Sequence, residues 1–150
     1  MKLKIPPPIV AILCALLMWA VARFVSWGGI PVAIPWYVPY VFVALAILLD
    51  LLALMSFKAV KTTFNPLKPH TASALVTSGI YQYTRNPMYL GLFSILLAFV
   101  LWFGSLLNIA VLLLFVWYMN RFQIVHEEEA LLKLFGEEYE GYRSRVRRWL

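Results

Sequence analysis

Four long apolar runs, separated by short polar or proline-rich stretches, dominate the pattern of this chain. They cover residues 9–27, 40–57, 87–103 and 106–124. A helix needs about 20 residues to cross the roughly 30 Å hydrocarbon core of a bilayer, and three of the runs are near that length. No useful stretch alternates apolar and polar residues with the period of two that a strand requires. The pattern predicts an all-α integral membrane protein with four transmembrane helices.

Glycines mark the expected ends of the last helices. Only Gly104 and Ser105 separate the last two apolar runs, which predicts a tight helical hairpin. The fourth helix is expected to continue past residue 124 into water. Gly136 is a natural stop for it, and a cytoplasmic C-terminal helix should follow.

The basic residues set the expected orientation, because positive charges near the ends of membrane helices remain on the cytoplasmic side. With the N-terminus inside, only Arg23 falls on the far side. The cytoplasmic side then receives Lys2, Lys4, Lys58, Lys61, Lys68, Arg85, Arg121, Lys133, Arg143, Arg145, Arg147 and Arg148. Both termini are therefore expected in the cytoplasm. In the alternative, Ala20-Val21-Ala22 marks the cleavage site of a secretory signal, whose removal would leave three crossings.

Composition supports a membrane protein and excludes other classes. The 150 residues suffice for a single membrane domain over 1–150 and are 63% hydrophobic and 13% charged, whereas a soluble domain is about half apolar and a quarter charged. The net charge of +6 comes from residues that flank apolar runs, so nucleic-acid binding is not expected. Cys14, His70 and His126 form no cluster, so no metal site is expected.

Polar residues collect in two stretches on the predicted cytoplasmic side, residues 58–89 and 121–150. Short loops tether both stretches to the same helices, so we expect them to converge at the inner leaflet on a single cavity. Asn86 suits an N-cap and Pro87 suits the first helical position of the third helix. The N–H groups at that helix end would favour a carboxylate or phosphate. The alternative is simply a well-capped membrane helix.

Two further features have a structural and a functional interpretation. Asp50 lies in an apolar run, where a carboxylate facing lipid would cost about 2.5–3.5 kcal/mol. It should face the bundle, either as a contact for a lipid substrate or in an interhelical hydrogen bond to Asn108 or Ser94. The tail from Arg143 onward is expected to lie on anionic lipid, with Trp149 as an interfacial anchor.

Three motif blocks, in this order, resemble the isoprenylcysteine carboxyl methyltransferase family, and phospholipid N-methyltransferases carry a related pattern. They are Leu75-Val76-Thr77-Ser78-Gly79-Ile80-Tyr81, then Arg85-Asn86-Pro87-Met88-Tyr89-Leu90-Gly91, then Glu127-Glu128 with Phe135-Gly136-Glu137-Glu138-Tyr139. The resemblance covers roughly residues 60–148. It is specific because the blocks occur together, since any one of them alone would be a weak signal.

The resemblance implies S-adenosylmethionine as the methyl donor, bound between the entry to the third helix and the C-terminal stretch. By position, the residues that would bind the donor are Leu75, Val76, Tyr81, Asn86, Pro87, Met88, Tyr89 and Glu127. The catalytic candidates are Arg121, Glu127 and Glu128. Transfer of a methyl group from a sulfonium requires positioning and charge matching, and it needs no metal.

The chain departs from the family at two positions. Asn86 stands where eukaryotic members have histidine, and Gln123 stands where the family has an arginine thought to meet the substrate carboxylate. A carboxylate acceptor would need a cation such as Arg121 instead, whereas an amine acceptor would need a base such as Glu128 or Asp50. Gln123 and Asp50 are therefore the candidate substrate-binding residues.

These observations predict an S-adenosylmethionine-dependent methyltransferase at the cytoplasmic membrane face. Its acceptor would be lipophilic or amphipathic, either an isoprenylcysteine-like carboxylate or a phospholipid amine. We expect a short, bacterial-type member of the family in the inner (plasma) membrane. The alternative is a non-catalytic membrane module or a small transporter component that retains the same scaffold.

Overall fold

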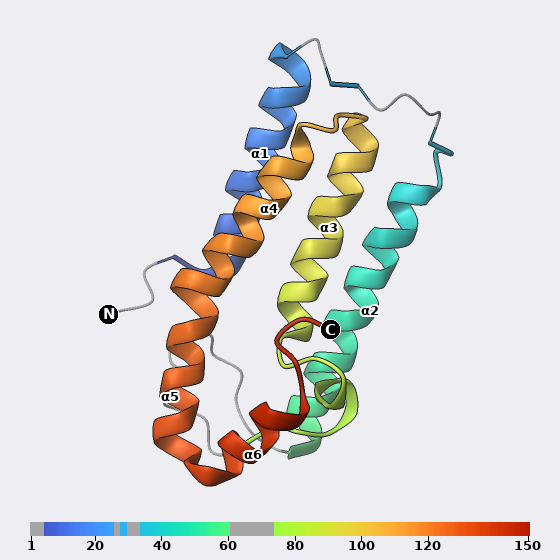
Figure 1. The fold of residues 1–150 in the computed structure, drawn as a ribbon. Helices are drawn as coiled ribbons and strands as arrows, with labels where there is room; N and C mark the ends of the chain where they lie inside the picture. The colour runs from blue at the N-terminus through green and yellow to red at the C-terminus, as the bar shows by residue number, and fades with distance from the viewer. Residues whose placement is uncertain (1–4, 26–27, 30–33, 61–73) are drawn as a thin grey trace.

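The computed structural model describes residues 5–25, 28–29, 34–60 and 74–150 (Figure 1). Within these ranges every regular element is helical, and the only β feature is an isolated bridge between Gly29 and Ser105. The all-α prediction is confirmed for this part of the chain. The predicted positions that lie outside it are Lys2, Lys4, Lys61, Lys68, His70 and the last two residues of the 9–27 run.

The helices follow the predicted apolar runs with shifted ends. In chain order they are α1 (Pro7–Phe24), α2 (Val38–Val60), the 3-10 helix η2 (Gly79–Gln82), α3 (Pro87–Phe103), α4 (Asn108–Tyr118), the π-helical turn η3 (Met119–Ile124), α5 (Val125–Phe135) and α6 (Glu137–Arg145). The predicted bounds of the third run match α3. The first helix begins before residue 9 because proline in the first helical turn needs no N–H partner and has a helical φ.

Three helices are long and apolar enough to cross a membrane, namely Pro7–Phe24, Val38–Val60 and Asn108–Phe135. Many of their large apolar side chains are exposed, including Leu13 at 55% and Ile47 at 56%, as expected for surfaces that face lipid. The remaining helix, α3, is apolar but has only 17 residues, which span about 25 Å. The chain is an integral membrane protein, and a count of four crossings stays a prediction.

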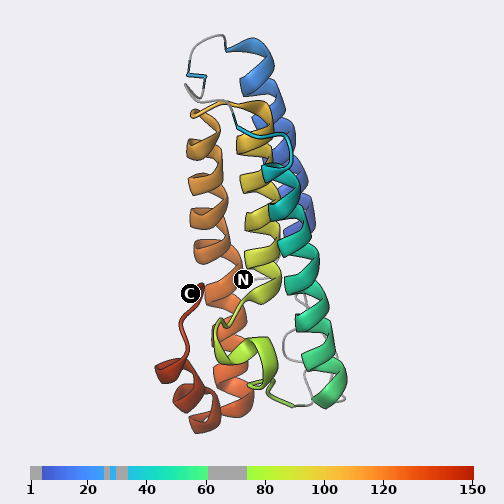
Figure 2. The ribbon, with the colours of Figure 1, turned by 90° about the vertical axis from the view of Figure 1, so that its right-hand side faces the viewer.

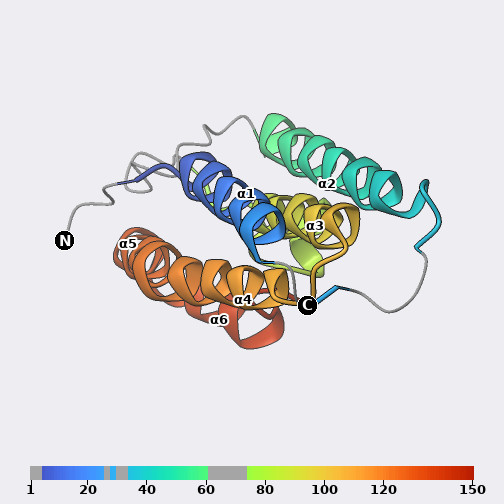
Figure 3. The ribbon, with the colours of Figure 1, turned by 90° about the horizontal axis from the view of Figure 1, so that it is seen from above.

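Helix α3 is the centre of the bundle. It contacts α1, α2 and α4, which surround it when the molecule is seen from above (Figure 3). The core between α1, α3 and α4 includes the fully buried side chains of Met18, Leu96 and Phe115. The segments α4, η3 and α5 form one long rod beside α3 that continues past its first turn (Figure 2). Residues on α3 and α5 are thereby brought together at that end.

The predicted hairpin between α3 and α4 is confirmed. Gly104 ends α3 with φ of 60°, and its N–H donates to the Leu101 carbonyl. A residue with a Cβ pays a steric cost in this left-handed conformation, which glycine avoids. The turn is also attached to the α1–α2 connection, because Leu106 N donates to Gly28 O at 2.8 Å.

Asp50 faces α3 from α2, as expected for a carboxylate that avoids lipid. A Cβ on Gly91 of α3 would lie 2.9 Å from Asp50 Oδ1 and 3.4 Å from the Ala46 carbonyl. The absence of a side chain at Gly91 therefore permits this close approach of the two helices.

The predicted hydrogen bond from Asp50 to Ser94 or Asn108 is wrong. Ser94 Oγ donates instead to the Leu90 carbonyl of its own helix, a local bond that serine commonly makes in apolar helices. The Asn108 side chain is completely buried near the hairpin, and its amide atoms have no partner among the described residues.

Replacing Gly91 with leucine should separate α2 from α3. The new side chain would displace both the Asp50 carboxylate and the backbone at Ala46, and overpacking of this kind costs about 1–3 kcal/mol. Thermal unfolding in detergent, followed by circular dichroism, should show a lower midpoint. Gly141→Ala is the matched control, because a Cβ there meets nothing within 4 Å and alanine favours the helix by about 0.5–1 kcal/mol. An unchanged midpoint for Gly91→Leu would contradict this view of the α2–α3 contact.

Candidate functional site

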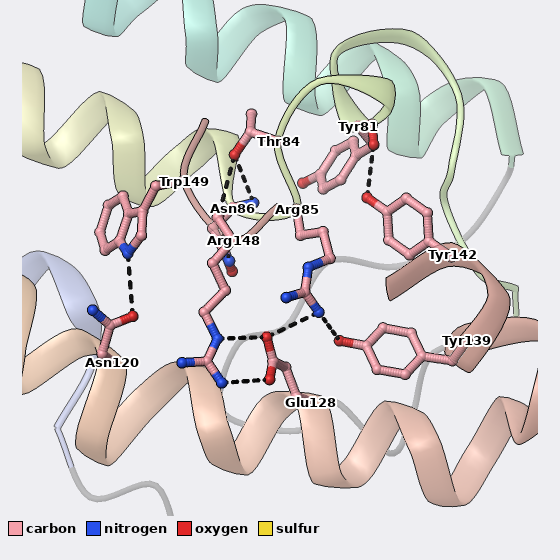
Figure 4. A network of polar contacts seen from close by, with 10 residues as sticks. All are labelled: Tyr81, Thr84, Arg85, Asn86, Asn120, Glu128, Tyr139, Tyr142, Arg148 and Trp149. Carbon is pink, nitrogen blue, oxygen red and sulfur yellow. Dashed lines mark hydrogen bonds and ion pairs between the residues drawn. The ribbon is translucent and has the colours of Figure 1, made fainter. Parts of the chain in front are cut away.

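The two polar stretches meet at the α6 end of the bundle, as the sequence predicts. The loop before α3 lies against α5 and α6 (Figures 1 and 4). The side-chain contacts that join the stretches include Tyr89 Oη to Glu127, Arg85 to Glu128 at 3.0 Å, and Tyr142 Oη to the Tyr81 carbonyl at 2.7 Å. Residues 74–89 and 121–150 are therefore in contact as predicted, while a single cavity at the inner leaflet stays a prediction.

The π-helical turn η3 determines which side chains face α3. A π turn has one extra residue per turn and occurs frequently at functional sites. Gln123 lies in η3, is 3% exposed and points toward Tyr89. Arg121 lies in the same turn but is exposed, with its guanidinium 6.0 Å from the centre of the Phe122 ring. The structure therefore brings Gln123 into the site and leaves Arg121 outside it.

Glu127 is held by two neutral donors. Its carboxylate accepts hydrogen bonds from the Tyr89 hydroxyl and from Gln123 Nε2, the latter at 2.7 Å. Among the described residues no arginine, lysine or histidine forms an ion pair with it. A carboxylate that is removed from bulk water gains most from a cationic partner. The arrangement leaves Glu127 able to bind a cationic group from outside the protein.

Glu128, the next residue, has the opposite environment. Its carboxylate receives a two-point contact from Arg148 at 2.8 and 2.7 Å and a further contact from Arg85 at 3.0 Å (Figure 4). The side chains of Glu128 and Arg85 are only about a tenth exposed. Tyr139 completes the network by accepting a hydrogen bond from Arg85. The geometry places Glu128 in an ion-pair network, on another face of α5 from Glu127.

Asn86 lies at the N-cap position of α3 but does not cap it, so the side-chain cap predicted from its type is wrong. Its Nδ2 donates instead to the carbonyl of Arg148 at 3.0 Å. Pro87 is buried at the first helical position, as predicted. Among the described residues, no side chain therefore caps the first turn of α3.

An apolar and aromatic wall borders these polar groups. Val76 and Tyr81 pack against Ala53 of α2, and the partly buried residues around them include Phe57 and Met88. The Tyr81 ring meets the Phe57 ring edge-on at 5.5 Å. Of the predicted donor-binding residues, Val76, Tyr81 and Met88 thus belong to one cluster. Leu75 is only half-buried beside it.

Tyr81 belongs to the apolar and aromatic wall and also lies near two carboxylates, Glu127 and Asp50. Burial raises the pKa of Tyr81, and the neighbouring Tyr142, Glu127 and Asp50 raise it further. Burial also raises the pKa of Tyr142. Both phenols therefore remain neutral at physiological pH. Asp50, from α2, and Glu127, from α5, are both close enough to Tyr81 for their charge to act on it.

The tail after α6 is where the sequence prediction fails most clearly. Trp149 does not serve as an interfacial anchor: its ring packs on Phe93 of α3, and its indole N–H donates to Asn120 Oδ1 at 3.1 Å. Arg148 contributes to the buried network rather than lying on lipid. The sequence has no local signal for this return, because it depends on partners 20 to 64 positions away.

Comparisons with known proteins agree with the motif blocks. Residues 34–138, more than two thirds of the chain, match the family model described as phospholipid methyltransferase. An uncharacterised protein of Haemophilus influenzae is 48% identical over 63 residues, which are 42% of this chain and all of that protein. No solved structure is significantly similar.

Two named relatives share a shorter part of their length with this chain. The protein-S-isoprenylcysteine O-methyltransferase of Schizosaccharomyces pombe is 38% identical over 72 residues, covering 48% of this chain and 30% of that protein. The Homo sapiens protein of the same name is 36% identical over 82 residues, covering 48% of this chain and 25% of that protein. The chain therefore spans less than a third of the length of these relatives.

The ion-pair network predicts a stability effect that does not depend on any reaction. Glu128→Gln would leave two guanidinium groups without their carboxylate, and removing one partner of a largely buried network should cost about 2–4 kcal/mol. The expected result is a clearly lower unfolding midpoint in detergent. Glu129→Gln is the control, since the Glu129 side chain is 61% exposed and its one ion pair among the described residues is with His126 at 3.6 Å. Equal midpoints for the two variants would refute a structural role for the network.

Proposed function

Because the chain belongs to the phospholipid methyltransferase family, we propose that it transfers a methyl group from S-adenosylmethionine to an acceptor carried by the membrane. The observation that carries this proposal is Glu127, a carboxylate whose partners among the described residues are two neutral donors, at the point where α3 and α5 meet. The names of the isoprenylcysteine O-methyltransferase relatives support a methyl-transfer activity.

The residues present fit such a donor, which carries an ammonium, a carboxylate and a positively charged sulfur. Glu127 would bind the ammonium through a charge-assisted hydrogen bond. The uncapped first turn of α3 would receive the carboxylate. The aromatic wall around Tyr81 would accept the adenine and stabilise a nearby cation with its ring faces.

The protein's own contribution would be to position these groups and match their charge. The Tyr89 hydroxyl and the Gln123 amide fix the direction in which the Glu127 carboxylate points. When bound, the donor would supply a methyl group on a cationic sulfur. The acceptor lone pair would attack the methyl carbon in line as the carbon–sulfur bond breaks, and S-adenosylhomocysteine would leave. Rate enhancement for such a step comes from orientation and from a preorganised electrostatic environment.

For the acceptor we propose an amine rather than a carboxylate. The two guanidinium groups nearest the site, those of Arg85 and Arg148, are engaged by Glu128, and Arg121 points away. Asp50 faces the same region from α2. An amine must lose a proton to become nucleophilic, and Asp50 is placed to accept it. A carboxylate acceptor would instead meet two carboxylates, while Arg85 and Arg148 are already paired with Glu128.

The positions of the basic residues support the orientation of the chain in the membrane that we propose. Arg85, Lys133 and Arg148 lie at the α6 end of the bundle, whereas Arg23 lies in the last turn of α1 at the opposite end (Figure 1). We place the α6 end on the cytoplasmic side of an inner (plasma) membrane, with four crossings. The proposed acceptor would then be a lipid, or a lipid-linked molecule, of the inner leaflet.

The donor site is tested by binding of S-adenosylhomocysteine, the demethylated donor, to protein in detergent. We expect calorimetry to give a dissociation constant below about 1 mM. Loss of a charge-assisted contact is worth about 1.5–3 kcal/mol, so Glu127→Gln should weaken binding about tenfold to a hundredfold. Glu129→Gln should bind like the wild type. Absence of binding by the wild-type protein would end the donor proposal.

The acceptor class is tested with donor labelled in its methyl group. Incubation with a membrane lipid extract should give a base-stable lipid product, and a prenylcysteine analogue should give none. Asp50→Asn should lower turnover about a hundredfold, within the usual range for loss of a general base, while binding of S-adenosylhomocysteine stays unchanged. A base-labile product would identify a carboxylate acceptor and contradict the amine proposal. No product from either acceptor would favour a non-catalytic membrane module.

A further inference from the structure

The C-terminal segment, residues 146–150, returns from α6 and lies across the entry to α3 (Figure 4). Three hydrogen bonds attach its backbone to the loop before α3: Arg85 N to Arg147 O at 3.0 Å, Asn86 Nδ2 to Arg148 O at 3.0 Å, and Thr84 Oγ1 to Arg148 O at 3.2 Å. Thr84 is completely buried by this contact and its neighbours. The segment is therefore an integral part of this end of the bundle.

Side chains of the same segment reach the other elements of the site. Arg148 makes its two-point contact with Glu128 of α5. Trp149 contacts Asn120 of η3 and Phe93 of α3. One short segment thus joins the three elements that carry Tyr89, Gln123 and Glu127.

The contact between Tyr89 and Glu127 depends on how far α5 stands from α3. Glu127 and Glu128 are consecutive, so a constraint on Glu128 also limits the movement of Glu127. Arg85 constrains Glu128 from the α3 side, and Arg148 constrains it from the C-terminal segment. Two guanidinium groups that share one carboxylate define its position better than either would alone.

The segment also redirects Asn86. Asparagine is among the preferred N-cap residues, and its carboxamide would normally satisfy an N–H of the first helical turn. Here Nδ2 of the carboxamide donates to the Arg148 carbonyl, and with the side chain held in this direction its oxygen does not cap α3.

We propose that the C-terminal segment is a positioning clasp for the donor site. Arg148 acts without touching the donor: it holds α5 at the spacing from α3 at which the Tyr89 hydroxyl meets Glu127, while its carbonyl keeps Asn86 from capping α3. This inference rests on the proposed donor site. Arg148 and Glu128 are accordingly positioning residues, not catalytic ones.

The test compares Arg148→Gln with Arg147→Gln. Arg147 is exposed and contributes its backbone carbonyl, which the substitution retains. Arg148→Gln should raise the donor KM and the dissociation constant of S-adenosylhomocysteine about tenfold, equivalent to about 1.4 kcal/mol, and change kcat less than about twofold. Arg148→Lys should restore part of the affinity, because it keeps the charge but loses the two-point contact. Arg147→Gln should match the wild type.

A second measurement is independent of any ligand. In a Cys14→Ser background, which removes the only cysteine of the sequence, spin labels are placed at the exposed positions Gln82 and Lys133. The distance distribution between the labels should be narrow in the wild type and in Arg147→Gln, and broad in Arg148→Gln. Circular dichroism establishes that each variant is folded.

The outcomes distinguish failure of the clasp from failure of the proposed donor site. An Arg148→Gln variant with an unchanged distance distribution would overturn the clasp, whatever happens to the KM, because Arg148 would then act on the donor directly or not at all. A broadened distribution together with an unchanged KM would also overturn it. If the distribution broadens as expected but even the wild type binds no S-adenosylhomocysteine, the clasp stands as a structural element and the donor site fails.

Discussion

The rest of this structure depends on the different environments of two adjacent carboxylates, Glu127 and Glu128. Charged groups beside hydrocarbon must find partners inside the protein, because lipid offers none. Glu128 obtains two guanidinium partners and thereby joins α5, the loop before α3 and the C-terminal segment. Among the described residues, Glu127 has a phenol and an amide as its partners. Glu128 thereby stabilises the architecture, whereas Glu127 has no cationic partner in the part of the chain that the structure describes.

The parts of the fold that follow from local chemistry are readable in the sequence. The apolar runs predicted the helices, Gly104 predicted the hairpin, and Gly136 predicted the end of the helix before α6. The meeting of the two polar stretches was also predictable, because short loops tether both to one bundle. The motif blocks indicated Tyr89 and Glu127 as partners in one site, and in the structure these two residues are in contact.

The remaining features depend on contacts that no local pattern encodes. Several arginines follow Gly136, and only the three-dimensional return of the chain shows that Arg148 is the one paired with Glu128. The side chain of Asn86 matches an N-cap by type, yet it does not cap α3, and its Nδ2 donates to a carbonyl 62 positions away. The π turn is equally invisible, because Met119–Ile124 contains neither proline nor glycine to mark an irregular turn. Each failure marks a place where tertiary contacts override local preference.

The π turn has a consequence for how this chain can vary. One residue of an α-helix corresponds to a rotation of about 100°. If a substitution changed Met119–Ile124 from π-helix to α-helix with all of its residues kept, every later side chain would rotate by about that angle relative to α3, because a π turn holds about one residue more than an α turn. Glu127 and Glu128 would then no longer face their present partners. Loss of one residue together with the π turn would instead leave the phase of α5 nearly unchanged. The π turn and the number of residues between the hairpin and the glutamate pair are therefore constrained together.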